Sequence, residues 1–280
     1  PMVVSEHGHW EYGGGSASTS DVHRAETISA DSFPGGQGPM LQQAWNHRES
    51  HHLNRGLSNM CGDGLWVGID YGAWPSGVFD FLRLPKFSAF FWQSQRDPDV
   101  DLSHLGLDSG PMIFVASHWN ADSPEDVTVF SNCQQVRLYI NDVLQETRTP
   151  DTSYPSANLL HPPFTFEGLT FQAGELKAEG LIDGQVAVEH VVRTPGPAAS
   201  VEVEFDITDV PANGSETLFV YATLRDANGT VAVDACPDVT FSVTGPATLL
   251  SEPVVTAEAG IAAALIQVTD QPGQITIEAG

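Results

Sequence analysis

The first hundred residues alternate between short apolar runs and helical spacing. Residues 2–4 are apolar without alternation, which is the pattern of a parallel strand covered on both faces. Helical spacing predicts a helix over residues 38–53, and a second strand-like run covers residues 64–71. Helical spacing returns over residues 79–95. This order indicates the tail of a parallel strand–helix barrel, because a whole barrel needs about 250 residues.

From about Pro111 the pattern changes to short β-branched runs separated by turn signals. The predicted strands before the Pro195-Gly196-Pro197 linker are residues 112–118, 126–130, 135–140, 164–171, 175–182 and 185–193, and those after it are 200–207, 217–226, 231–233, 239–243, 254–258, 262–268 and 274–279. Tight hairpin turns are predicted at Asn141-Asp142, Asp183-Gly184 and Asn228-Gly229. Strands at this spacing predict β-sandwiches.

These patterns predict a multidomain protein. Residues 1–98 are expected to form the last two βα units of a (β/α)8 TIM barrel. Residues 99–196 are expected to form one β-sandwich domain and residues 197–280 a second, and both sandwiches are expected to be immunoglobulin-like. A chain of 280 residues is long enough for several such domains.

Charge removes two classes of partner. The chain has 36 Asp and Glu against 11 Lys and Arg, a net charge of -25, so nucleic acid and an anionic membrane surface are both disfavoured. A solvated acidic surface is the simpler interpretation. Its three cysteines lie far apart without C-x-x-C spacing, so free, mostly buried thiols are expected rather than a disulfide framework.

The candidate chemistry begins with Glu6, which ends the first apolar run. In a closed barrel the C-terminal ends of the strands carry the catalytic groups, and Gly8 frees the backbone to turn there. From this segment alone, an exposed strand-end acid without a function is an equal alternative.

Several segments together resemble glycoside hydrolase family 2, the β-galactosidase-like enzymes, over essentially the whole chain. The resemblance rests on residues 1–8 with Trp10-Glu11-Tyr12, on Leu41-Gln42-Gln43-Ala44, on residues 64–71, on Arg83-Leu84-Pro85-Lys86-Phe87, and on residues 129–133, 136–141 and 174–178. Residues 1–8 resemble the nucleophile segment on the seventh barrel strand, and residues 64–71 resemble the eighth strand.

The resemblance implies a retaining β-glycosidase with Glu6 as the nucleophile. Such an enzyme also needs a protonated carboxyl about 5–5.5 Å from the nucleophile. The family supplies it as a Glu after an Asn on the fourth strand, and this chain has no Asn-Glu pair. We therefore expect the acid/base, with the remainder of the catalytic domain, N-terminal to Pro1, and the 280 residues alone to be inactive.

Other residues are candidates for contacting the sugar. Trp10 and Trp66 could stack on a pyranose face, and Tyr71 could hydrogen-bond a hydroxyl, although Trp66 could instead be a barrel-core side chain. Glu11 and Asp70 are expected to orient sugar hydroxyls, and His7 and His51 to contact them. His7-Gly8-His9 departs from the family pattern, and a metal held there with Glu11 is a lesser alternative; no cofactor is required.

The expected substrate is an oligosaccharide or polysaccharide-derived β-galactoside. The family's Asn-x-Lys uronate signature is absent, so only Arg24, Arg48 and Arg55 remain as cations that could bind a uronate carboxylate. A β-glucuronide or a β-mannoside is therefore the second choice of substrate. A different class of function is a non-catalytic carbohydrate-binding or spacer module. A homo-oligomer is left open, and secretion or a periplasmic location is expected from the family and the acidity.

Overall fold

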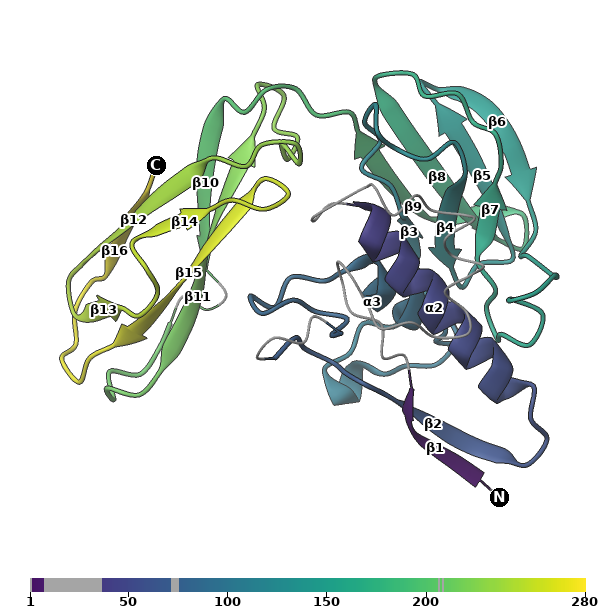
Figure 1. The fold of residues 1–280 in the computed structure, drawn as a ribbon, viewed down its shortest axis with the longest axis horizontal. Coiled ribbons are helices and arrows are strands. Elements are labelled where there is room, and N and C mark those ends of the chain that lie inside the picture. The colour runs from purple at the N-terminus through teal and green to yellow at the C-terminus, as the bar shows by residue number, and fades with distance from the viewer. Residues whose placement is uncertain (1, 8–36, 72–75, 206, 208) are drawn as a thin grey trace. The chain divides into compact units, whose positions relative to one another are not determined.

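The computed structural model describes residues 2–7, 37–71, 76–205, 207 and 209–280, and the chain divides into two compact units, Pro1–Thr194 and Pro195–Gly280 (Figure 1). The first unit contains the described helices and a parallel strand pair, followed by antiparallel sheets. The second is built from strands. None of the helices in the described part of the chain is long and apolar enough to cross a membrane.

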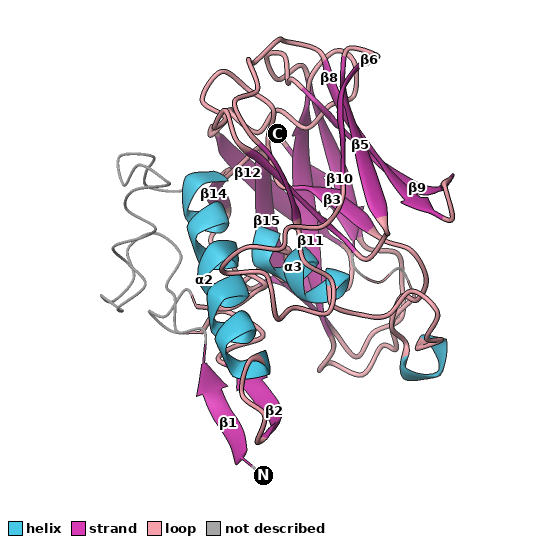
Figure 2. Ribbon diagram, turned by 90° about the vertical axis from the view of Figure 1, so that its right-hand side faces the viewer, coloured by secondary structure: helices cyan, strands magenta, loops and turns pink. Residues whose placement is uncertain are grey.

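The first unit begins with a parallel strand pair and a helix. Strand β1 (Met2–His7) pairs in parallel with β2 (Met60–Leu65), and helix α2 (Gln37–Arg55) connects back between them. Helix α2 packs against both β2 and α3 (Phe87–Ser94), as Figure 2 shows for the two helices. The predicted parallel strand and the predicted helix are therefore confirmed.

Two details of the strand predictions are wrong. Val3 is 61% exposed, so β1 is not covered on both faces; only β2 pairs with it in the described chain. The second strand ends at Leu65, where the prediction had it run over residues 64–71. Beyond Leu65 the backbone turns to a later segment, because Val78 N–H donates to Val67 O and Phe79 N–H donates to Gly68 O.

The last predicted helix is also shorter than its apolar spacing suggested. Helix α3 begins at Phe87, whereas residues 79–86 form turns in which the Asp80 carboxylate accepts hydrogen bonds from the N–H groups of Leu82 and Leu84. Pro85 restricts the residue before it and has no N–H, so it favours this late start. Inside the helix, Phe91 is fully buried and Phe90 stacks on Phe114 at 3.7 Å between ring centroids.

Two antiparallel sheets complete the first unit. One has the order β3 (Ile113–Val115), β4 (Val127–Ser131), β7 (Phe164–Phe166), and the other the order β6 (Val143–Arg148), β5 (Gln135–Ile140), β8 (Glu175–Ile182), β9 (Gln185–Arg193). Both contribute to one hydrophobic core, in which Val129, Leu138 and Phe164 are completely buried. A short 3-10 helix, Ser103–Leu105, precedes them.

The second unit also has two sheets around one core. Its four-stranded sheet has the order β10 (Ser200–Phe205), β11 (Thr217–Arg225), β15 (Ile261–Val268), β13 (Ala247–Leu249), and its three-stranded sheet has the order β14 (Val254–Thr256), β12 (Asp238–Thr244), β16 (Thr276–Ala279). Val220, Phe241 and Ile266 belong to the core between them. Residues 231–233, predicted as a strand, make only an isolated bridge through Val231.

Two of the three predicted hairpin turns carry the expected backbone. Asn141 and Asp142 both have positive φ (49° and 64°), as do Asp183 and Gly184 (50° and 76°), which is the conformation that two-residue hairpins need. The tight turn predicted at Asn228-Gly229 is wrong, because only Gly229 has positive φ (83°) and the loop is closed by Asp226 N–H donating to Thr230 O. The three cysteines are free, but only Cys133 is buried; Cys61 and Cys236 are exposed, so the expectation of mostly buried thiols is wrong.

Candidate active site

The C-terminal ends of β1 and β2 lie at one edge of the parallel pair. His7 at the end of β1 is in register with Leu65 at the end of β2, so Glu6 precedes this last pair by one residue and Trp66 follows it by one residue. The ladder is irregular between Val4 and His7, which pair with Asp63 and Leu65. The structure describes the backbone, not the side chains, of Glu6 and His7; His9, Trp10, Glu11 and Arg24 lie outside the described residues.

Two predicted aromatic residues come together just past this edge. Trp66 directly follows β2, and its ring meets that of Tyr71 edge to face at 5.8 Å between centroids and 78° between planes. Trp66 is 36% exposed and Tyr71 is 43% exposed. Aromatic side chains of this size with accessible faces are suited to stacking on an apolar ligand face.

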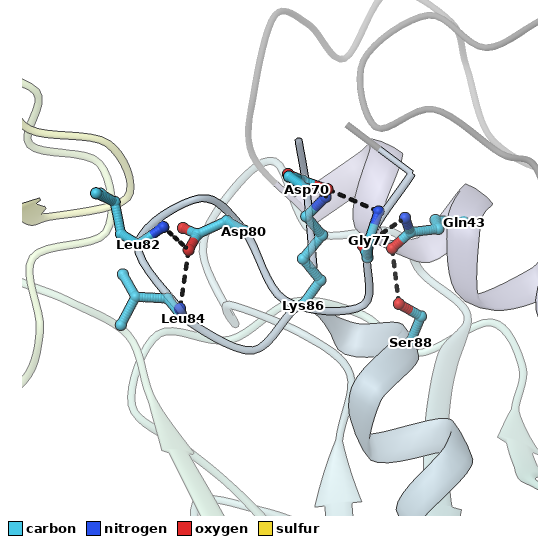
Figure 3. A network of polar contacts seen from close by, with 8 residues as sticks. All are labelled: Gln43, Asp70, Gly77, Asp80, Leu82, Leu84, Lys86 and Ser88. Atoms are coloured by element: carbon cyan, nitrogen blue, oxygen red, sulfur yellow. Dashed lines mark hydrogen bonds and ion pairs between the residues drawn. The ribbon is translucent and has the colours of Figure 1, made fainter. Parts of the chain in front are cut away.

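Asp70 occupies a buried polar network instead of an open surface. Lys86 Nζ lies 2.8 Å from each carboxylate oxygen, and Gly77 N–H donates to Oδ1 at 2.7 Å (Figure 3). The side chains of Asp70 and Lys86 are only 3% and 5% exposed. Asp70 therefore forms an internal ion pair, whereas the sequence suggested that it would orient sugar hydroxyls.

The same network fastens the described parts of the connection between β2 and α3, residues 66–71 and 76–86, which we call the strap. Gln43 of α2 donates from Nε2 to Gly77 O and accepts a hydrogen bond from the hydroxyl of Ser88 in α3 (Figure 3). Gly77 sits so close to Asp70 that an added Cβ would lie 2.3 Å from the Asp70 nitrogen. Only glycine fits there, since real Cβ atoms do not approach backbone that closely.

His51 lies in the layer between α2, α3 and β2. Its Nδ1 is 2.9 Å from Asp63 Oδ2, and its ring meets Trp92 at 4.8 Å between centroids. Burial lowers the pKa of His51, and the hydrogen bond that the ring donates to the Asp63 carboxylate opposes that shift only in part, so the ring is neutral near pH 7. His51 is 8% exposed, so its packing is that of an internal side chain, not the sugar contact that was predicted.

The two described arginines considered for a uronate contact residues 151–158 instead. Arg48 Nη1 lies 3.9 Å from Asp151 Oδ2, and Arg55 donates from Nε to Asn158 O. Neighbouring Glu49 accepts a hydrogen bond from the Tyr154 hydroxyl, which belongs to the same segment. These contacts fasten α2 to the segment that follows β6.

Sequence reasoning missed the partners of the predicted residues. Lys86, Gly77 and Asp63 were not assigned a role, although Lys86 stands in a motif that carries the family resemblance and is one of only two lysines. The pairing of Asp70 with Lys86 leaves no local trace, because it joins residues 16 positions apart through the turns of the strap. Among the residues described by the structure, no group of three or more His, Cys, Asp and Glu side chains could hold a metal.

Family models match the two β-sheet regions. Residues 201–280 match the model described as glycoside hydrolase family 2 C-terminal domain 5. Residues 122–188 match a model described as a domain of unknown function, DUF4982. Both regions therefore correspond to recognised domain types.

Relatives match across much of the chain. A β-galactosidase of Thermoanaerobacter pseudethanolicus is 33% identical over 267 residues, covering 85% of this chain and 35% of that protein. A β-glucuronidase of Formosa agariphila is 29% identical over 178 residues, covering 61% of this chain and 16% of that protein. The chain thus spans about a third or less of the length of these relatives.

Solved structures share the fold. A β-glucuronidase from glycoside hydrolase family 2 superposes with a TM-score of 0.74 at 22% identity, covering 100% of this chain and 30% of that one. A β-glycosidase from Bacteroides vulgatus gives 0.71 at 20% identity, covering 84% and 31%. At these identities the likeness concerns the fold alone.

The parallel strand pair followed by antiparallel sheets has the fold of solved β-glycosidase and β-glucuronidase structures. The C-terminal domain model and the β-galactosidase relative identify the family within the glycoside hydrolases. The chain belongs to glycoside hydrolase family 2 and corresponds to the C-terminal part of such an enzyme.

Proposed function

We propose that the chain is part of a retaining β-glycosidase that hydrolyses β-galactosides, with Glu6 as the nucleophile. The observation that carries the proposal is the common edge of β1 and β2, where Glu6 comes just before the last paired residues, His7 and Leu65, and the strap that bears Trp66 and Tyr71 begins just after them. A carboxylic acid residue at a strand end and accessible aromatic rings on the segment after the neighbouring strand are two of the features that retaining glycosidases use. The β-galactosidase relative supports the choice of sugar.

In the proposed reaction an ionised Glu6 attacks the anomeric carbon and the bond to the leaving oxygen breaks. A second carboxyl, about 5–5.5 Å away, protonates that oxygen and then deprotonates the water that releases the sugar. This acid/base is proposed to come from residues N-terminal to the chain. Trp66 and Tyr71 bind the apolar face of the sugar and hold it in position for attack.

We also propose that residues 1–98 are the last two βα units of the TIM barrel. The parallel pairing of β1 with β2 and the 61% exposure of Val3 support this, because parallel strands are normally covered on both faces. Residues 99–196 and 197–280 are proposed as immunoglobulin-like sandwiches, which the two-sheet cores support. The expected partners are the rest of the catalytic domain and, as substrate, an oligosaccharide or polysaccharide-derived galactoside.

A β-glucuronidase is the second candidate, because one relative carries that name. A uronate would require a cation in the site. Arg48 and Arg55 contact residues 151–158, so neither supports this alternative. Comparing turnover of paired aryl β-galactoside and β-glucuronide substrates distinguishes the two, and a preference for the glucuronide would overturn the proposed specificity.

The nucleophile is tested with Glu6→Gln in the intact polypeptide that carries this chain. The expected result is loss of turnover with binding of galactose retained, because the amide keeps the shape of the carboxylate but cannot attack. Glu204→Gln, at an exposed carboxylate on β10, is the matched control and should leave turnover unchanged. Unchanged turnover in Glu6→Gln would instead favour a non-catalytic carbohydrate-binding module.

A further inference from the structure

The strap carries its exposed aromatic rings on a backbone that is held from both sides. Trp66 and Tyr71 bracket a stretch whose N–H and C=O groups pair with residues 77–79: Val78 N–H donates to Val67 O, and Asp70 N–H donates to Phe79 O. Lys86 N–H then donates to Val78 O. The backbone under the aromatic rings is therefore fastened to the segment that leads into α3.

A buried ion pair, Asp70 with Lys86, also connects these two backbone segments. The Asp70 carboxylate immediately precedes Tyr71 and receives Gly77 N–H and both contacts from Lys86 Nζ. Lys86 is the residue just before α3, and Gln43 of α2 holds Gly77 O. One side-chain network thus connects the two helices to the residue next to Tyr71 (Figure 3).

We propose that Asp70 and Lys86 are positioning residues for substrate binding, acting through Tyr71 and Trp66 without touching the sugar. This inference rests on the proposed function. Asp70 and Lys86 fix the height and angle of the Trp66–Tyr71 ring pair relative to the edge that holds Glu6. If the pair is broken, the strap relaxes and the rings lose their stacking geometry, while the reacting carboxylate on β1 is unaffected.

Such a loss falls mainly on KM. Stacking is made in the bound substrate as well as in the transition state, so its removal weakens both alike and leaves kcat nearly unchanged. In the intact enzyme, Asp70→Asn should raise KM for an aryl β-galactoside by about tenfold, with kcat within about threefold. Asp80→Asn is the matched control, because Asp80 caps Leu82 and Leu84 in the same strap and should leave KM unchanged.

A double-mutant cycle separates positioning from general destabilisation. In a Trp66→Ala, Tyr71→Ala background, Asp70→Asn should no longer change KM, because the rings through which it acts are absent. Ser88→Ala, which removes the hydroxyl that holds Gln43, is a milder second perturbation and should raise KM in the same direction by a smaller factor.

The two proposals fail in different ways. If Glu6→Gln retains turnover, the proposed function is wrong whatever Asp70 does. If turnover depends on Glu6 but Asp70→Asn and Ser88→Ala leave KM unchanged, or Asp70→Asn raises KM equally in the background without rings, the positioning inference is overturned. A fall in kcat with KM unchanged also overturns it.

Discussion

The ion pair between Asp70 and Lys86 gives a quantitative prediction about stability. Replacing Lys86 with Met leaves the Asp70 carboxylate in a place where its side chain is 3% exposed, with Gly77 N–H as its remaining partner among the contacts described. Removing one member of a buried ion pair costs about 3–5 kcal/mol, because the other charge stays out of water. With a urea dependence of about 3 kcal/mol per M, the midpoint should fall by about 1–2 M.

Tryptophan fluorescence is the suitable assay, because all six tryptophans precede Pro195 and report on the first unit only. The variant that replaces both partners, Asp70→Leu with Lys86→Met, should recover most of the loss, since two apolar groups leave no buried charge. If the single variant shifted the midpoint by less than about 0.3 M of urea, the ion pair would not be buried as described and the reasoning would be refuted.

Three further predictions concern glycine, histidine and tyrosine. Gly77→Ala should destabilise the first unit far more than Gly68→Ala, since a Cβ at Gly77 meets backbone at 2.3 Å and one at Gly68 meets nothing within 4 Å; equal urea midpoints would contradict this. Burial lowers the pKa of both His51 and His190 in the folded protein, so their contribution to the free energy of unfolding should be complete above pH 6.5 and fall as the pH is lowered, because the unfolded state takes up protons first. His190→Gln should reduce the slope of the unfolding free energy against pH by up to about 1.4 kcal/mol per pH unit. An unchanged slope would refute the assignment. Tyr154→Phe should lower the free energy of unfolding by about 1–3 kcal/mol, because it removes the hydroxyl that donates to the buried Glu49. Tyr139→Phe should cost less, because its partner Glu179 also pairs with Lys177. The reverse order in urea denaturation would be contrary to the structure.

Strands β5 and β8 were predictable because one face is more buried than the other, whereas β9 has no buried position and was predictable from its β-branched residues. Strands β5, β8 and β9 have the predicted bounds, and β5 and β8 alternate between buried and half-buried positions. Strand β6 was missed because its last four residues, Gln145 to Arg148, are polar, so neither an apolar run nor an alternation marks it. The short β13, Ala247–Leu249, was missed as well.

The site was predictable only where it is local in sequence. Glu6 follows an apolar run and Trp66 lies within one, and the parallel pairing brings the two strand ends together as a barrel would. Strand β2 was misplaced because Met60–Leu65 contains two glycines and an acid, while the apolar stretch after it forms hydrogen bonds with residues 77–79. The partners of Asp70 and His51 depend on tertiary contacts that no spacing encodes.

The central claim is that Glu6 is the nucleophile of a retaining enzyme. Incubating the intact enzyme with a 2-fluoro-β-galactoside that bears a good leaving group should trap the glycosyl–enzyme ester, because the electron-withdrawing fluorine slows its hydrolysis. Peptide mass mapping should then place one fluoro-sugar on Glu6 and none on the Glu6→Gln variant. A label on another carboxylate, or an enzyme that turns over galactosides with inversion and is never labelled, would contradict the account.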